Sequence, residues 1–114
     1  MNSLEGKVIL VTGAASGIGQ ATAAAVREAG GIVAGADISP IPNLGHDDVG
    51  FELDVSDADQ TESIVAQIVS RFGRIDGAAT CAGVAVVGSV TQFALESWSR
   101  ALTINLTGTM LTCR

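Results

Sequence analysis

Short apolar runs alternate along the chain with longer segments of helical periodicity. The apolar runs predict four strands, at residues 8–11, 32–36, 51–53 and 78–82. The first run, Val-Ile-Leu-Val, has no polar interruption, which is typical of a strand that is covered on both faces. Strands that alternate with helices form βαβ units, and we therefore expect a parallel sheet between helical layers.

Two helices are expected between these strands. Residues 20–29 are rich in alanine and are followed by two glycines, which favours a helix that ends there. We expect a second helix to begin with Ser56 as its N-cap, supported by Asp59 three positions later, and to end at Gly73. Its apolar positions fall on one stripe, formed by Ile64, Val65, Ile68, Val69 and Phe72.

The remaining segments are a loop and a third helix. Residues 38–50 contain two prolines and Gly45, so this connection is expected to be a loop or a single turn. A helix is expected from about Leu95, and the chain ends inside it. Its helical spacing aligns Trp98, Ala101, Leu102 and Asn105.

A glycine-rich turn, residues 12–19, joins the first predicted strand to the first predicted helix. In a dinucleotide-binding loop, Gly13 makes the sharp turn, Gly17 admits a pyrophosphate, and Gly19 lets the helix pack tightly on the strand. The backbone at Ser16 and Ile18 then points N–H groups at the phosphates. A tight turn without a ligand is the alternative, but its place between a strand and a helix favours dinucleotide binding.

Asp37 closes the second predicted strand, 18 positions after Gly19. A carboxylate there accepts hydrogen bonds from the adenosine ribose hydroxyls and repels the 2′-phosphate of NADP. The neighbouring residues are uncharged, so no cation is expected to pair such a phosphate. This pattern favours NAD as the cofactor, with a solvated aspartate that caps a loop as the alternative.

The composition excludes several classes of function. The net charge is −6 and the few basic residues are scattered, which argues against nucleic-acid binding. The first seven residues have no signal-peptide pattern, and no membrane span is expected. We interpret Cys81 and Cys113 as free thiols of a cytoplasmic protein, a single disulfide between them being the alternative. No metal site is predicted.

These residues together resemble the short-chain dehydrogenase/reductase family. The resemblance consists of Thr-Gly-x-x-x-Gly-x-Gly at residues 12–19, Asp37, Asp54-Val55, Ala82-Gly83, and Asn105 within Trp-Ser-Arg-Ala-Leu-Thr-Ile-Asn. It covers essentially the whole chain in the right order and spacing. It implies a three-layer α/β sandwich with a Rossmann-like parallel sheet of strand order 3-2-1-4, truncated relative to the family. Residues 1–114 are accordingly expected to be the N-terminal portion of the dinucleotide-binding domain.

The resemblance also implies roles for individual residues. Asp54 and Val55 are expected to border the adenine, and Ala82 and Gly83 to pass close to the adenosine ribose. Asn105 corresponds to the family's catalytic asparagine, which helps to hold a water in the proton relay. A strand-end aspartate and a buried structural asparagine are the alternatives for Asp54 and Asn105.

The sequence departs from the family pattern in two places. Thr80-Cys81 stands where the family has Asn-Asn, so Cys81 is expected at the cofactor site as a core thiol and not as a nucleophile. The family's Ser and its Tyr-x-x-x-Lys relay are missing, because the chain contains no tyrosine and Lys7 lies on the first strand. His46, the single histidine, is expected to be solvated.

Two hypotheses follow for function. In the first, the chain is part of an NAD-dependent oxidoreductase that transfers hydride to or from an alcohol or carbonyl carbon. In the second, it is a non-catalytic module that binds or senses NAD. In either case we expect a homo-oligomer or a complementary C-terminal segment, because strand four and the last helix lack cover.

Overall fold

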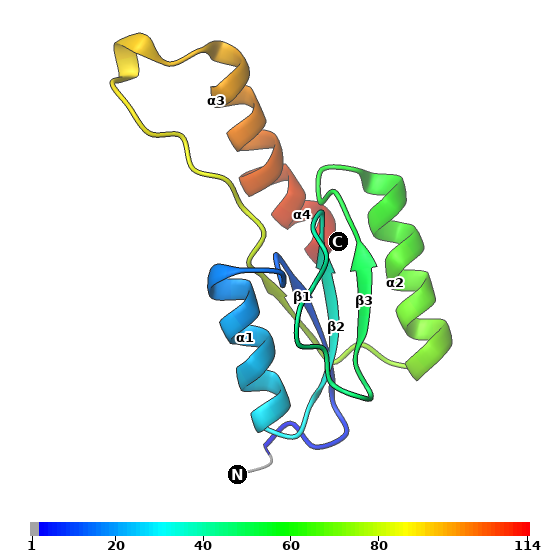
Figure 1. Cartoon of the computed structure of the whole chain (residues 1–114). Coiled ribbons are helices and arrows are strands. Elements are labelled where there is room, and N and C mark those ends of the chain that lie inside the picture. The colour runs from blue at the N-terminus through cyan, green and yellow to red at the C-terminus, as the bar shows by residue number, and fades with distance from the viewer. Residues whose placement is uncertain (1–2) are drawn as a thin grey trace.

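The computed structural model describes residues 3–114 and contains one parallel sheet. Its four strands are β1 (Val8–Thr12), β2 (Ile32–Asp37), β3 (Val49–Glu52) and β4 (Gly77–Thr80). They lie in the order β3-β2-β1-β4, which confirms the predicted order 3-2-1-4 (Figure 1). Residues 1 and 2, which contributed to the prediction that no signal peptide is present, lie outside the described residues.

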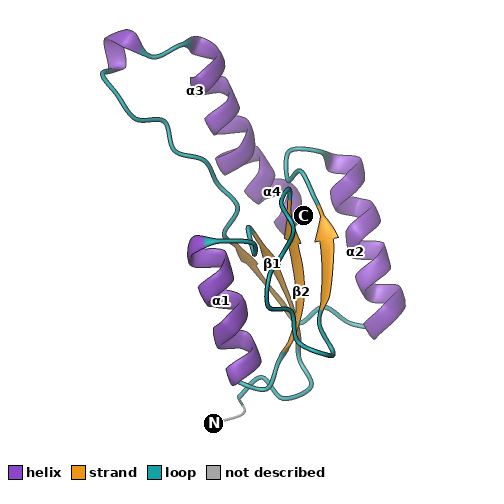
Figure 2. Ribbon diagram, in the orientation of Figure 1, coloured by secondary structure: helices purple, strands orange, loops and turns teal. Residues whose placement is uncertain are grey.

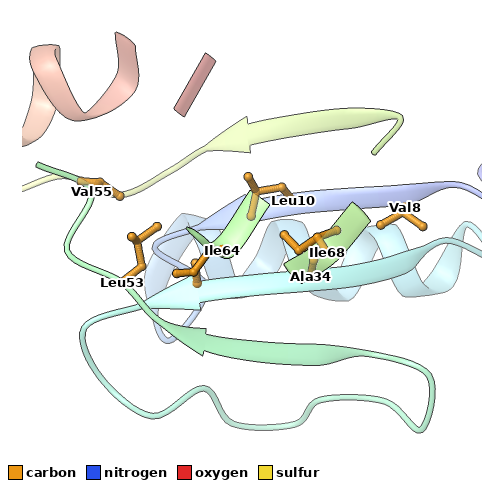
Figure 3. Close-up of a cluster of buried hydrophobic side chains, with 8 residues drawn as sticks. Val8, Leu10, Ala34, Leu53, Val55, Ile64 and Ile68 are labelled. Carbon is orange, nitrogen blue, oxygen red and sulfur yellow. The ribbon is translucent and has the colours of Figure 1, made fainter. Parts of the chain in front are cut away.

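Helices cover the sheet on both faces, as the three-layer prediction requires. Helix α1 (Gly17–Glu28) lies on one face and α2 (Ala58–Phe72) on the other (Figure 2). Successive strand residues point to opposite faces, and two separate apolar clusters result. The α2 side buries Val8, Leu10, Ala34, Leu53, Val55, Ile64 and Ile68 together (Figure 3). The α1 side buries Val11, Ala14, Ala23, Val26 and Val33.

Several predicted boundaries shift. Helix α1 begins at Gly17 and not at residue 20, so the glycine-rich turn supplies its first residues. The third strand begins and ends earlier than predicted, although Leu53 beyond it is buried, and the fourth strand is Gly77–Thr80 instead of residues 78–82. Strand pairing ends where β1 ends at Thr12, which explains the early end of β4.

The predicted N-cap of α2 was wrong by one residue. Asp57 occupies the cap in an extended conformation, and its carboxylate accepts a hydrogen bond from Gln60 N. Ser56 lies one residue before the cap, and its hydroxyl donates to Asp54 Oδ1 at 2.6 Å. The end of α2 at Gly73 is confirmed.

The connection between β2 and β3 is a loop, as predicted, and Asp48 anchors it. The Asp48 carboxylate accepts hydrogen bonds from Val33 N at 2.9 Å and from Gly45 N at 2.8 Å. Arg27 on α1 approaches the same carboxylate at 3.4 Å, and the Asp48 side chain is only 3% exposed. The loop is therefore fixed to both β2 and α1.

The last part of the chain is a long helical arm that follows a short 3-10 turn (Val90–Gln92). It consists of α3 (Leu95–Leu102), a π-helical turn (Thr103–Thr107) and α4 (Gly108–Cys113). The α4 end lies near the sheet, whereas α3 projects away from it (Figure 1). None of the helices within residues 3–114 combines the length and apolar composition that crossing a bilayer requires.

Candidate functional site

A cavity of about 710 Å³ opens at the carboxyl ends of the strands. In parallel α/β sheets this edge is where ligands bind, because loops from different strands converge there. The cavity gathers ten of the eleven predicted cofactor residues, namely Gly13, Ser16, Gly17, Ile18, Asp37, Asp54, Val55, Cys81, Ala82 and Gly83. These residues come from the ends of all four strands, and the fold brings them to one place.

The glycine loop lies at the centre of this cavity and depends on backbone conformations that favour glycine. Gly13 has φ +68° and Gly17 has φ +56°. A Cβ on Gly13 would lie 2.7 Å from Ala82 N, so the loop packs directly on the end of β4. A Cβ on Gly17 would meet nothing within 4 Å. The backbone at Gly17 is thus open to a ligand, while the backbone at Gly13 is closed off by protein.

Gly19 is the one predicted cofactor residue that does not line the cavity. It is buried in the first turn of α1, and a Cβ there would collide with the carbonyl oxygen of Gly13. The helix therefore rests against the loop itself. Gly19 packs against the glycine loop, whereas Ser16, Gly17 and Ile18 line the cavity.

The start of α1 offers hydrogen-bond donors to the cavity. The first N–H groups of an α-helix have no acceptor within the helix. Ser16, the N-cap residue, makes no side-chain capping bond to satisfy them. The helix dipole adds partial positive charge at this end. Together these donors form a place for an anionic group such as a phosphate.

Asp37 lies at the end of β2, where both of its carboxylate oxygens accept backbone hydrogen bonds. Oδ2 accepts from Ala15 N of the glycine loop at 3.0 Å, and Oδ1 accepts from Ser39 N at 2.9 Å. The neighbouring Ala14 N donates to Ala36 O at 3.3 Å. The carboxylate is half-buried and lines the cavity. Its remaining lone pairs are available to hydroxyl donors.

Asp54 provides a second carboxylate at the cavity, from the end of β3. Oδ1 accepts from the Ser56 hydroxyl at 2.6 Å and from Ser56 N at 2.9 Å. These hydrogen bonds, the hydroxyl first, lower the pKa of Asp54 below its ordinary value, and the charge of Arg100 adds to the effect. Asp54 is therefore ionised at neutral pH.

The end of β4 closes the opposite side of the site. Ala82 N donates to Thr12 Oγ1 at 3.3 Å, so β4 is tied to β1 just beyond the last paired residues. The Cys81 thiol lies 3.8 Å from Thr22 Oγ1 on α1. A thiol thus fits where the family has an asparagine, and both cysteines, Cys81 and Cys113, are free.

Asn105 lies in the π-helical turn and does not line the cavity. Both ends of its side-chain amide bond to one residue, because Oδ1 accepts from Val84 N and Nδ2 donates to Val84 O, both at 2.8 Å. The side chain therefore clamps the arm to the loop that follows β4. Its backbone carbonyl accepts a hydrogen bond from the Thr109 hydroxyl at 2.7 Å.

The cavity also contains residues that the sequence prediction missed. The arm contributes Ser99, Arg100, Thr103 and Ile104, and the strand ends contribute Ala36, Ile38, Ser39, Leu53, Ser56 and Val84. Arg100, Thr103 and Ile104 have the i, i+3, i+4 spacing of one helix face, and that spacing was the available signal. Within residues 3–114 no cluster of His, Cys, Asp or Glu has a geometry suited to a metal ion.

Comparisons with known proteins find related dehydrogenases. D-threitol dehydrogenase of Mycolicibacterium smegmatis is 40% identical over 97% of this chain and 46% of its own length. A 2,5-dichloro-2,5-cyclohexadiene-1,4-diol dehydrogenase of Sphingobium indicum is 35% identical over 97% of this chain and 47% of its own length. The chain thus spans about half the length of the curated relatives it matches.

Solved structures give the same result. The ligand-free aldohexose dehydrogenase of Thermoplasma acidophilum superposes with a TM-score of 0.91 at 28% identity, over 97% of this chain and 43% of that one. A family model described as short chain dehydrogenase matches residues 7–114. The chain therefore belongs to the short chain dehydrogenase family of oxidoreductases.

Proposed function

We propose that this chain forms the NAD site of an oxidoreductase that transfers hydride to or from an alcohol or carbonyl carbon. The observation that carries the proposal is the cavity, in which a helix start with unsatisfied N–H groups, an open Gly17 and the Asp37 carboxylate converge. A dinucleotide needs these features together, because its pyrophosphate is anionic and its ribose donates hydroxyl hydrogens. When bound, NAD supplies the hydride acceptor.

NAD is proposed over NADP because of the charge around Asp37. A carboxylate that faces the ribose repels a 2′-phosphate, and no basic residue adjoins it in the sequence. Arg100 is the cation that lines the cavity, and its charge acts on Asp54 at the end of β3. Asp54 and Val55 are proposed to border the adenine, and Ala82 and Gly83 the adenosine ribose.

Proton transfer requires groups that these 114 residues do not contain, since the chain has no tyrosine. We propose that a segment corresponding to the other half of the relatives supplies the Tyr-x-x-x-Lys relay. Asn105 contributes by position, because its amide clamp to Val84 fixes the arm beside the cavity. The substrate is proposed to be an alcohol or carbonyl compound, as the names of the relatives suggest.

Calorimetric titration with NAD, NADH and NADPH tests the cofactor assignment. We expect NAD and NADH to bind at least about tenfold more tightly than their 2′-phosphorylated counterparts, equivalent to about 1.4 kcal/mol. Arg100→Ala should leave this ratio unchanged if Asp37 determines it. Equal affinity for NADH and NADPH, or a ratio that collapses in the Arg100 variant, would contradict the assignment.

A non-catalytic NAD-binding or sensing module is the second candidate. The cavity supports it, because a cofactor site alone can bind NAD whether or not a proton relay adjoins it. An assay of alcohol oxidation by the natural protein separates the two candidates. Turnover supports the oxidoreductase, whereas NAD binding without turnover of any alcohol in a broad panel supports the module.

We further propose that the exposed apolar face of the arm is covered in the functional protein, by a second copy or by a C-terminal segment. Leu95, Trp98, Leu106 and Met110 are each at least half exposed, and burying them is worth about 25 cal/mol per Å². A cytoplasmic location is proposed because both cysteines are free thiols.

A further inference from the structure

We infer that Asp37 is a positioning residue for the glycine loop as well as a ribose-binding residue. This inference deepens the proposed NAD site and rests on it for the identity of the ligand. Its structural basis is independent of any ligand, because the hydrogen bonds that carry it lie within the protein. Residue 37 is 22 positions after Ala15, and the two are joined directly by a side-chain hydrogen bond.

The carboxylate bridges two loops that have no other side-chain bond between them. Oδ2 accepts from Ala15 N in the glycine loop, and Oδ1 accepts from Ser39 N after β2. A carboxylate has two acceptor oxygens and no donor, so it satisfies both N–H groups at once. Hydrogen bonds to an ionised acceptor are also roughly twice as strong as neutral ones.

The bridge determines where the anion-binding amides lie. On one side the loop packs through Gly13 against Ala82, where there is no room for a Cβ. On the other side the loop is held by Ala14 N on Ala36 O and by Ala15 N on Asp37. Gly17, which is open to the cavity, follows directly after this braced segment. Asp37 therefore fixes the donors before a ligand arrives, and such preorganisation increases affinity.

The consequence concerns cofactor preference. Replacing Asp37 to admit a 2′-phosphate also releases the glycine loop, which every dinucleotide needs. Asparagine keeps one acceptor oxygen, but it turns an amide N–H toward the second backbone N–H. Alanine removes both acceptors. We therefore expect single substitutions at this position to lose NAD affinity without gaining comparable NADP affinity.

The decisive experiment compares NAD with an analogue whose adenosine lacks both ribose hydroxyls, using the intact protein and its Asp37→Ala variant, which removes both acceptor oxygens. If Asp37 only binds the sugar, both proteins bind the analogue equally well. If Asp37 also positions the loop, the variant binds the analogue about tenfold more weakly, as expected for the loss of a charge-assisted hydrogen bond. Equal binding of the analogue would overturn the inference.

Amide hydrogen exchange of the ligand-free protein gives an independent test. In Asp37→Ala, exchange at Ala15 N is expected to rise about tenfold, while the amides of β1 stay protected and show that the variant is folded. Asp54→Ala is the matched control, because Asp54 accepts from Ser56 N just as Asp37 accepts from Ser39 N but has no bond to the glycine loop. Unchanged protection at Ala15 in Asp37→Ala would refute the positioning role.

The two tests also separate this inference from the proposed function. If the wild-type protein fails to bind NAD while Ala15 loses protection in Asp37→Ala, the cofactor assignment fails and the positioning role stands. If NAD binds and the protection of Ala15 is unaffected, the cofactor assignment stands and the positioning role fails.

Discussion

The two ends of the molecule carry similar apolar stripes but give them different surroundings. In the β1–α1–β2 unit, Gly19, Ala23 and Val26 of α1 are buried against the sheet. In α3 no residue is buried, and Trp98 is 51% exposed. The stripe of α1 packs against β1 and β2, whereas the stripe of α3 has no covering surface within residues 3–114. An amphipathic pattern predicts a helix in both cases, and only the presence of a partner surface determines burial.

The strongest test of this comparison is to disturb the tightly packed end. Gly19→Ala places a methyl group on the Gly13 carbonyl, which no side-chain rotation can relieve. We expect a loss of about 3 kcal/mol in the free energy of unfolding, measured by urea denaturation. Gly17→Ala is the matched control, since its methyl group meets open space and costs only about 1 kcal/mol for the left-handed backbone. Equal losses in both variants would contradict the packing argument.

A second test removes a buried anchor of the same region. Asp48→Ala leaves the N–H groups of Val33 and Gly45 without their acceptor and leaves Arg27 without its partner. We expect a loss of about 2 kcal/mol, because the carboxylate is almost completely buried. Denaturation measures the loss, and Asp47→Ala, an exposed neighbour, is the control. If Asp48→Ala lost less free energy of unfolding than Asp47→Ala, the loop would be stable without the Asp48 contacts.

The arm should respond in the opposite way. Leu106→Ser changes a side chain that is 66% exposed, so the stability of a monomer is expected to change by less than about 0.5 kcal/mol. If a second copy covers this face, the same variant shifts sedimentation toward the monomer. A large loss of stability without a change in assembly state would show that the arm packs within its own chain.

The smallest effect is expected at Asp54. Its pKa is lowered in the folded state, first by the Ser56 hydroxyl, so its contribution to stability is present above the ordinary pKa near 3.8 and is lost as pH falls through the lowered value. Ser56→Ala should raise this pKa toward its ordinary value, as NMR titration of the carboxyl group can measure. The effect on stability is small because the group is exposed to solvent. An unchanged pKa would show that the Ser56 hydroxyl is not the main cause, which leaves the Ser56 backbone N–H and the charge of Arg100.

The apolar runs predicted the strands, the family resemblance supplied their order, and together they predicted ten of the twenty residues that line the cavity. Apolar runs identify buried strands, and strand ends converge on one edge whatever the details of packing. The N-cap of α2 was missed because Ser56 and Asp57 are equally good caps in isolation, and only the folded backbone, in which Asp57 accepts from Gln60 N, distinguishes them. Arg100 and the bridge from Asp37 to Ala15 were missed because they depend on contacts between distant segments.

The π-helical turn changes which face of the arm the residues after it occupy, compared with an uninterrupted α-helix. Gly108 N bonds to Thr103 O, five positions earlier, so the turn holds one residue more than an ordinary α-helical turn. In an uninterrupted α-helix, Thr107 would come to the place that Gly108 now takes beside Val55. A Cβ at that place would lie too close to Val55. One additional residue thus brings the two faces of the arm into register, with Thr103 and Ile104 toward the cavity and the smallest residue toward the core.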